Sequence, residues 1–115
     1  MTELESLRDE LRDFAAARDW DQFHSPKNLA MALSVEAAEL LEHFQWLTEE
    51  ESRKLDPGAQ AAVSEEIADV LLYLIRLGDQ LHIDPVAAAQ RKMAKNAQKY
   101  PADKARGNSK KYDEL

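Results

Sequence analysis

Two pairs of acidic residues lie inside segments that otherwise have the pattern of buried helices. The pairs are Glu36 with Glu39 and Glu66 with Asp69. Residues three apart are neighbours on a helix surface, with roughly 5–6 Å between their Cβ atoms, so each pair points two carboxylates the same way. If the two helices pack together, four carboxylates meet. The fold must therefore bring these two helices side by side or leave the pairs unexplained.

Both pairs have apolar surroundings. The first segment carries an apolar stripe at spacings of three, four and seven, made by Leu29, Leu33, Leu40, Phe44 and Leu47. Glu36 falls within this stripe and Glu39 lies beside it. In the second segment, Asp69 opens the run 70–75, which is apolar on every side. Ionised carboxylates are costly to bury alone, so four of them need protons or cations.

An all-oxygen ligand set of high charge favours Mg²⁺ or Mn²⁺ over zinc or copper. A single Glu-x-x-Glu pair is common and usually belongs to a solvated helix face. Two pairs that both interrupt apolar stripes favour a metal site instead.

The rest of the chain also has helical periodicity and capping signals. We predict helices over residues 2–18, 26–45, 48–55, 59–81 and 86–99. Ser25-Pro26 and Asp84-Pro85 each place a capping residue before a proline, at the helix position where a missing N–H costs nothing. No strand signal and no internal repeat is present. The expected fold is all-α, an antiparallel four-helix bundle.

At 115 residues the chain is long enough for one domain. We expect residues 1–100 to form this domain and residues 101–115 to form a basic extended tail. The segment 59–81 is apolar nearly all round, more than a four-helix monomer of this size needs to bury. That surplus predicts a homo-oligomer, either a dimer or a tetramer.

The composition excludes several partners. The formal net charge is −7, and nucleic-acid binding depends on Lys and Arg, so a nucleic-acid partner is not expected. A small phosphorylated substrate remains possible, because a bound metal ion neutralises its charge. The absence of cysteine excludes disulfides and thiolate chemistry. With neither a signal-like segment nor a run of ~20 apolar residues, we expect no membrane association and a cytoplasmic location.

The motif Glu36-x-x-Glu39 followed by Glu66-x-x-Asp69 resembles the signature of the all-α MazG-type nucleoside triphosphate pyrophosphohydrolases. Further segments are similar to the branch that includes dCTP pyrophosphatases, and these are residues 18–24, 44–46, 69–73, 99–101 and 106–112. Together they cover nearly the whole chain.

The resemblance implies a reaction and a cofactor. The reaction is hydrolysis between the α and β phosphates of a nucleoside triphosphate, releasing a nucleoside monophosphate and pyrophosphate. The resemblance implies that Glu36, Glu39, Glu66 and Asp69 hold Mg²⁺, with Mn²⁺ as a possible substitute. A preference for dCTP or modified dCTP follows from the branch alone. Glu36 and Glu39 are also the candidates for orienting or deprotonating the attacking water.

One position departs from the family pattern. Many members carry a further acid directly before the first pair, where this chain has Val35. Either Glu65 or another carboxylate replaces it, or fewer ligands are used. The number of metal ions therefore stays open.

Aromatic and polar residues near the acids are candidates for holding the nucleotide. Trp20 and Trp46 suit a clamp for the base, since base stacking on an aromatic ring is worth roughly 1–3 kcal/mol. Tyr73 lies one turn beyond Asp69 on the same side. The remaining candidates are His24, Asn28, Lys92, Asn96 and Tyr100. Each alone has a structural alternative, a core aromatic ring or a solvated basic face.

Two rival interpretations remain. A di-iron carboxylate bundle uses Glu-x-x-His, whereas here His43 follows Glu39 by four residues and no histidine lies near Asp69. A non-catalytic helical oligomerisation or adaptor module would explain the apolar segment 59–81. It would leave four interior carboxylates without a reason.

Overall fold

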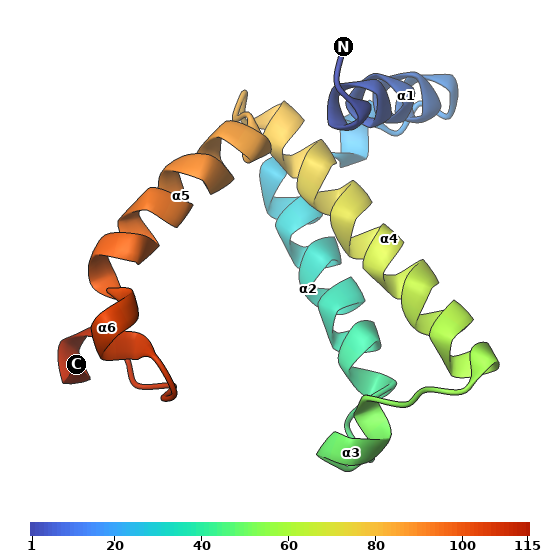
Figure 1. Cartoon of the computed structure of the whole chain (residues 1–115). Helices are drawn as coiled ribbons and strands as arrows, with labels where there is room; N and C mark the ends of the chain where they lie inside the picture. The colour runs from blue at the N-terminus through green and yellow to red at the C-terminus, as the bar shows by residue number, and fades with distance from the viewer. The chain divides into compact units, whose positions relative to one another are not determined.

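The computed structural model describes residues 1–115, and every regular element in it is helical (Figure 1). The elements are α1 (Glu3–Ala17), the 3₁₀ helix η1 (Asp21–Phe23), α2 (Pro26–Glu42), α3 (Glu49–Ser52), α4 (Pro57–Gln80), α5 (Pro85–Lys99), α6 (Ala102–Ala105) and the 3₁₀ helix η2 (Tyr112–Glu114). The predicted all-α class is confirmed. None of these helices combines the length and apolarity needed to cross a membrane.

Capping side chains set where the helices begin. Thr2, Ser25 and Asp84 accept hydrogen bonds from backbone N–H groups in the first turns of α1, α2 and α5. Each satisfies a donor that would otherwise lack a partner. Asp56 does the same for α4, which starts at Pro57, two residues before the position expected from sequence.

Two segments differ from their predicted form. Helix α2 ends at Glu42, three residues earlier than expected, and α3 is only four residues long. Residues 101–115, expected to be extended, contain α6 and η2. The Tyr112 ring explains part of this folding, because it packs edge-on against Tyr100 at 6.4 Å and lies 4.9 Å from the Lys99 Nζ.

The chain divides into two compact units, residues 1–83 and residues 84–115. This division falls after Ile83 rather than at residue 100. In the first unit, α4 packs along α2 and also against α1 (Figure 1). That unit contains three long helices, and α5 belongs to the second unit, so the four-helix bundle stays a prediction.

The first unit buries a small apolar core, made by Ala15, Leu29, Val63 and Ile75. Helix α4 leaves other large apolar side chains 41–54% exposed, namely Ile67, Leu71 and Leu74. Side chains at spacings of four and three lie on one face of a helix. A single chain therefore leaves an apolar face of α4 open.

Candidate functional site

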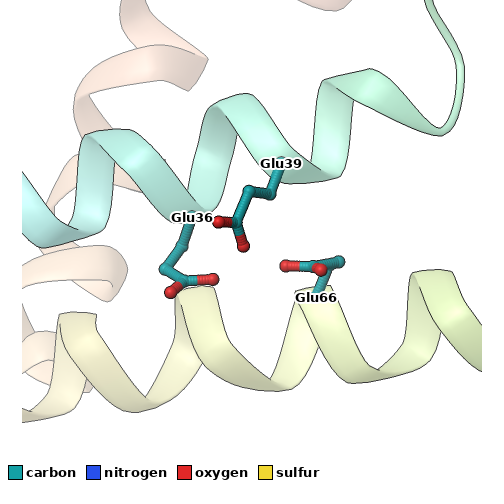
Figure 2. Close-up of side chains that lie close together, drawn as sticks. All are labelled: Glu36, Glu39 and Glu66. Carbon is teal, nitrogen blue, oxygen red and sulfur yellow. The ribbon is translucent and has the colours of Figure 1, made fainter.

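Three of the four predicted acids meet between two helices. Glu36 and Glu39 project from α2 toward Glu66 on α4 (Figure 2). One carboxylate oxygen from each residue lies within 4.8 Å of the others. We call these three residues the acid cluster. Its geometry follows from the three-residue spacing on α2 and from the packing of α4 along the same face.

The acid cluster lacks the partners that buried carboxylates need. One oxygen of Glu36 and one of Glu66, both Oε2, are buried without a hydrogen-bond partner. No Lys or Arg forms an ion pair with the cluster, and the side chain nearest to such a role is the His43 imidazole, whose Nε2 lies 3.9 Å from Glu66 Oε1. Unpaired buried carboxylate oxygens are rare and costly. Three convergent oxygen donors of this kind fit a hard divalent cation.

The charges of the acid cluster act on one another. Burial raises the pKa of Glu36 to about 7, and the neighbouring Glu39 carboxylate contributes to this rise. Asp69 and Glu66 add smaller effects in the same direction. A cation placed among these groups would lower the pKa of Glu36 again, because a positive charge favours the ionised carboxylate.

Asp69 lies outside the acid cluster but close to it. It follows Glu66 by three residues on α4, and its carboxylate is near enough to contribute to the raised pKa of Glu36. Its side chain also lines a neighbouring cavity. Glu65, the possible replacement for the acid missing at Val35, is exposed on α4 and is not part of the cluster.

The cavity has a volume of about 410 Å³ and lies among α1, α4 and the segment around η1. Its wall is mainly apolar and aromatic, with Leu11, Phe14, Trp20, Leu72 and Tyr73 among the lining residues. Small-molecule sites have volumes of roughly 300–1,000 Å³ and combine such a wall with a few polar groups. Here the polar groups include His24, Asp69 and Arg76.

Trp20 reaches the cavity because of the way α1 ends. Asp19 adopts a left-handed conformation with φ 54°, and the Trp20 N–H donates to the Ala15 carbonyl at 2.9 Å. This pattern is a Schellman motif, which satisfies the last carbonyls of a helix and turns the chain sharply. The Trp20 ring packs edge-on against Phe14 at 5.6 Å and remains 42% exposed. The ring is thus held by Phe14 while part of it stays exposed at the cavity.

A network around Arg76 was not predicted from the sequence. Arg76 is 5% exposed, and its guanidinium donates to Asp21 Oδ1 at 2.5 Å and to His24 Nδ1 at 3.1 Å. Its Nη1 lies 3.7 Å from Asp79, which accepts two hydrogen bonds from Arg12 at 2.5 and 2.6 Å. The available signal was an arginine inside an apolar run with an aspartate three residues later.

The other predicted residues have varied surroundings. The Asn28 side chain donates to the Phe23 carbonyl at 2.9 Å, so it holds the turn before α2. Trp46 is 86% exposed and does not line the cavity, so one chain does not bring it to Trp20. The remaining candidates belong to the second unit, and their contact with a substrate stays a prediction; they are Lys92, Asn96 and Tyr100.

Comparison with known proteins identifies the relatives of this chain. dCTP pyrophosphatase 1 of Homo sapiens is 46% identical over 114 residues, covering 97% of this chain and 67% of that protein. The protein of the same name from Rattus norvegicus is 44% identical with the same coverage. A pyrophosphatase from Archaeoglobus fulgidus has a crystal structure that matches with a TM-score of 0.82 and 47% identity, over 88% of this chain and 94% of that one. Residues 31–115 match the MazG-like family. The resemblance seen in the acidic motifs is thus confirmed, and the chain belongs to the MazG-like family.

Proposed function

We propose that this protein is a divalent-metal-dependent nucleoside triphosphate pyrophosphohydrolase. It would cleave between the α and β phosphates and release a nucleoside monophosphate and pyrophosphate. The observation that carries this proposal is the acid cluster on α2 and α4. Asp69 lies beside this cluster and also lines the aromatic cavity, so the two features adjoin. A cation site beside a cavity for a planar base is what this substrate requires. The names of the relatives support the same reaction class.

Glu36, Glu39, Glu66 and Asp69 would hold the cation, which we propose to be Mg²⁺ with Mn²⁺ as a substitute. The buried, unpartnered oxygens of Glu36 and Glu66 support this assignment. When bound, such an ion neutralises charge on phosphate oxygens and lowers the pKa of a bound water. A carboxylate of the acid cluster with a free oxygen would orient the attacking water and accept its proton, and Glu36 and Glu39 are the candidates.

The cavity would hold the base of the nucleotide. The exposed part of the Trp20 ring would supply a stacking surface, and Tyr73 lies one turn beyond Asp69 on the same helix. We propose dCTP or a modified dCTP as the substrate, because the relatives that match over most of the chain are named dCTP pyrophosphatase 1. The pairing of Trp46 with Trp20 belongs to this proposal, with Trp46 supplied from outside the single-chain cavity.

We also propose that the chain acts as a homo-oligomer, a dimer or a tetramer, in which the helix bundle is completed. The apolar face of α4, made by Ile67, Leu71 and Leu74, supports this assembly. Exposed apolar surface of this kind is characteristic of interaction sites.

The test is pyrophosphate release from a panel of NTPs and dNTPs with Mg²⁺. We expect release to be greatest with dCTP-like substrates and to fall by about 100-fold or more in Glu39→Gln. Glu42→Gln is the matched control, since Glu42 is an exposed acid on the same helix. Cleavage of no nucleotide under any divalent ion would overturn the proposal and leave a non-catalytic module. Full activity in Glu39→Gln would place the reaction elsewhere.

A further inference from the structure

Arg76 is the only buried charged residue of the chain, and the proposed reaction does not use it. It projects from α4 to the segment around η1, where it contacts Asp21 and His24. Burying an arginine is costly unless its charge is paired, and Asp21 and Asp79 supply that pairing. The contact with the His24 ring is not needed for this purpose. It therefore calls for a separate explanation.

The hydrogen bond from Arg76 fixes the protonation of the His24 ring. The Arg76 Nε–H is only a donor, so His24 Nδ1, at 3.1 Å, must accept with an unprotonated lone pair. A neutral imidazole with a free Nδ1 carries its proton on Nε2. An imidazolium would instead place an N–H against the Arg76 N–H. Burial and the Arg76 charge lower the pKa of His24 and outweigh the opposite effect of the Asp21 carboxylate, in agreement with a neutral ring.

The remaining polar atom of this ring, Nε2, makes no hydrogen bond within the chain, and His24 lines the cavity. The His24 ring also lies against Trp20, with ring centroids 6.1 Å apart. A fixed N–H donor next to an aromatic face suits a planar ligand that presents a hydrogen-bond acceptor at its edge.

Arg76 is itself held by a second helix. Its neighbour Asp79 accepts two hydrogen bonds from Arg12, so α1 is tied to the same stretch of α4. The Arg12 guanidinium does not contact His24. Arg12 and Arg76 therefore share a partner but differ in whether they touch the imidazole, which makes them a matched pair for mutation.

We propose that Arg76 is a positioning residue that holds His24 as a neutral Nε2–H donor. The cavity would then select a base that turns a carbonyl oxygen or an unprotonated ring nitrogen toward His24. The selection of the base rests on the proposed function, whereas the state of the imidazole does not.

The state of the imidazole is tested by ¹⁵N NMR of the histidine ring nitrogens across pH. In the wild type we expect His24 to be the neutral Nε2–H tautomer at pH 7.5 and to take up a proton at a lower pH than an ordinary histidine. In Arg76→Met we expect protonation at a higher pH and an admixture of the Nδ1–H tautomer, while Arg12→Met matches the wild type. A wild-type Nδ1–H tautomer, or identical titrations in wild type and Arg76→Met, would overturn the proposal.

The selection is tested by steady-state kinetics on dCTP and on deoxyribose triphosphate without a base. For dCTP, we expect Arg76→Met to raise KM about five- to tenfold, the size of one lost hydrogen bond, with kcat changed less than about threefold. The base-free substrate should show no such rise. Arg53→Met, which removes an exposed arginine outside the cavity, should leave both values unchanged. His24→Ala should raise KM equally, and the double variant should add nothing, because both changes remove one interaction.

An equal rise in KM on the base-free substrate would show a merely structural role and overturn the selection. If the wild type cleaves no nucleotide, the selection falls together with the proposed function, and the NMR result alone decides the role of Arg76. If Arg76→Met does not fold, His24→Gln and His24→Phe replace it. The glutamine amide supplies an N–H donor without help from Arg76, so it should keep KM within about threefold while phenylalanine raises it. Equal KM values in these two variants would overturn the selection.

Discussion

At the scale of single residues, the acid cluster carries negative charge that the chain does not compensate. Glu36 and Glu66 each bury an oxygen without a partner, and no Lys or Arg forms an ion pair with either residue. Without metal, protonation of a carboxylate therefore reduces this negative charge. The raised pKa of Glu36 is the consequence. Protons and a divalent cation are alternatives at this place. That competition gives the cluster a measurable dependence on pH and on metal.

Metal-free protein should lose stability as the pH rises through neutrality, and Glu36→Gln should lose less. The folded-state pKa of Glu36, about 7, lies above its ordinary value of 4.5. Proton uptake by this group therefore stabilises the fold fully below pH 4.5, and the contribution is lost as the pH rises through about 7. Thermal unfolding with a chelator between pH 4.5 and 8.5 measures this, with Glu42→Gln as control. Parallel curves for wild type and Glu36→Gln would contradict the assignment.

Adding Mg²⁺ at pH 7.5 should raise the unfolding temperature of the wild type and leave that of Glu39→Gln nearly unchanged. A ligand that binds only the folded state adds about 2.7 kcal/mol at a concentration 100 times its dissociation constant. The measurement is a thermal melt over a series of Mg²⁺ concentrations, with NaCl matched for ionic strength. A wild-type melt that does not respond would favour the adaptor module over the enzyme.

At the scale of elements, helix α4 links the two halves of the site. Glu66 faces α2 in the acid cluster, while Arg76 and Asp79, further along the same helix, engage η1 and α1. Ten residues of α-helix span about 15 Å. Helix α4 therefore sets the distance between Glu66 in the acid cluster and Arg76, which contacts His24. The position of α1 on α4 then decides the shape of the cavity.

Asp79→Asn should weaken the attachment of α1 to α4. The Arg12 hydrogen bonds, assisted by the charges of Arg12 and Arg76, lower the pKa of Asp79 below 3.8. The stabilisation is therefore present above pH 3.8 and is lost as the pH falls through the lower folded-state pKa. Urea unfolding should show a less stable variant at pH 7 and a smaller difference at pH 3. Asp13→Asn, an exposed acid on α1, is the control, and an equal effect there would refute the cross-link.

The elements also show what local sequence determines. Ser25 and Asp84 cap helices as predicted, because a cap bonds to N–H groups only two or three residues away. The acid cluster was predictable, since helical spacing and one helix pair suffice to assemble it. The Arg76 network was not, because its partners Asp21 and His24 lie more than fifty residues away and nothing local pairs them. The position of Trp46, in the turn between α2 and α3, likewise depends on packing beyond its own segment.

At the scale of the whole molecule, the single chain has an incomplete core. Only four apolar residues are buried, whereas large apolar side chains are exposed on both helices that form the acid cluster. On α2 these include Met31 and Val35, and on α4 they form the face of Ile67, Leu71 and Leu74. The acid cluster lies between these helices, so whatever covers their outer faces also stabilises the site. The proposed oligomer supplies such a cover.

Leu71→Lys should therefore break the assembly and lower stability together. A lysine in the middle of the apolar face would place an unpaired charge in the interface, and such burial is among the most destabilising changes known. We expect light scattering after gel filtration to give a multiple of 13.1 kDa for the wild type and a smaller mass for the variant. The wild-type unfolding temperature should rise with protein concentration, as it does for folded oligomers. Gln60→Lys, an exposed polar position on α4, should keep the wild-type mass, and a monomeric wild type would refute the interface.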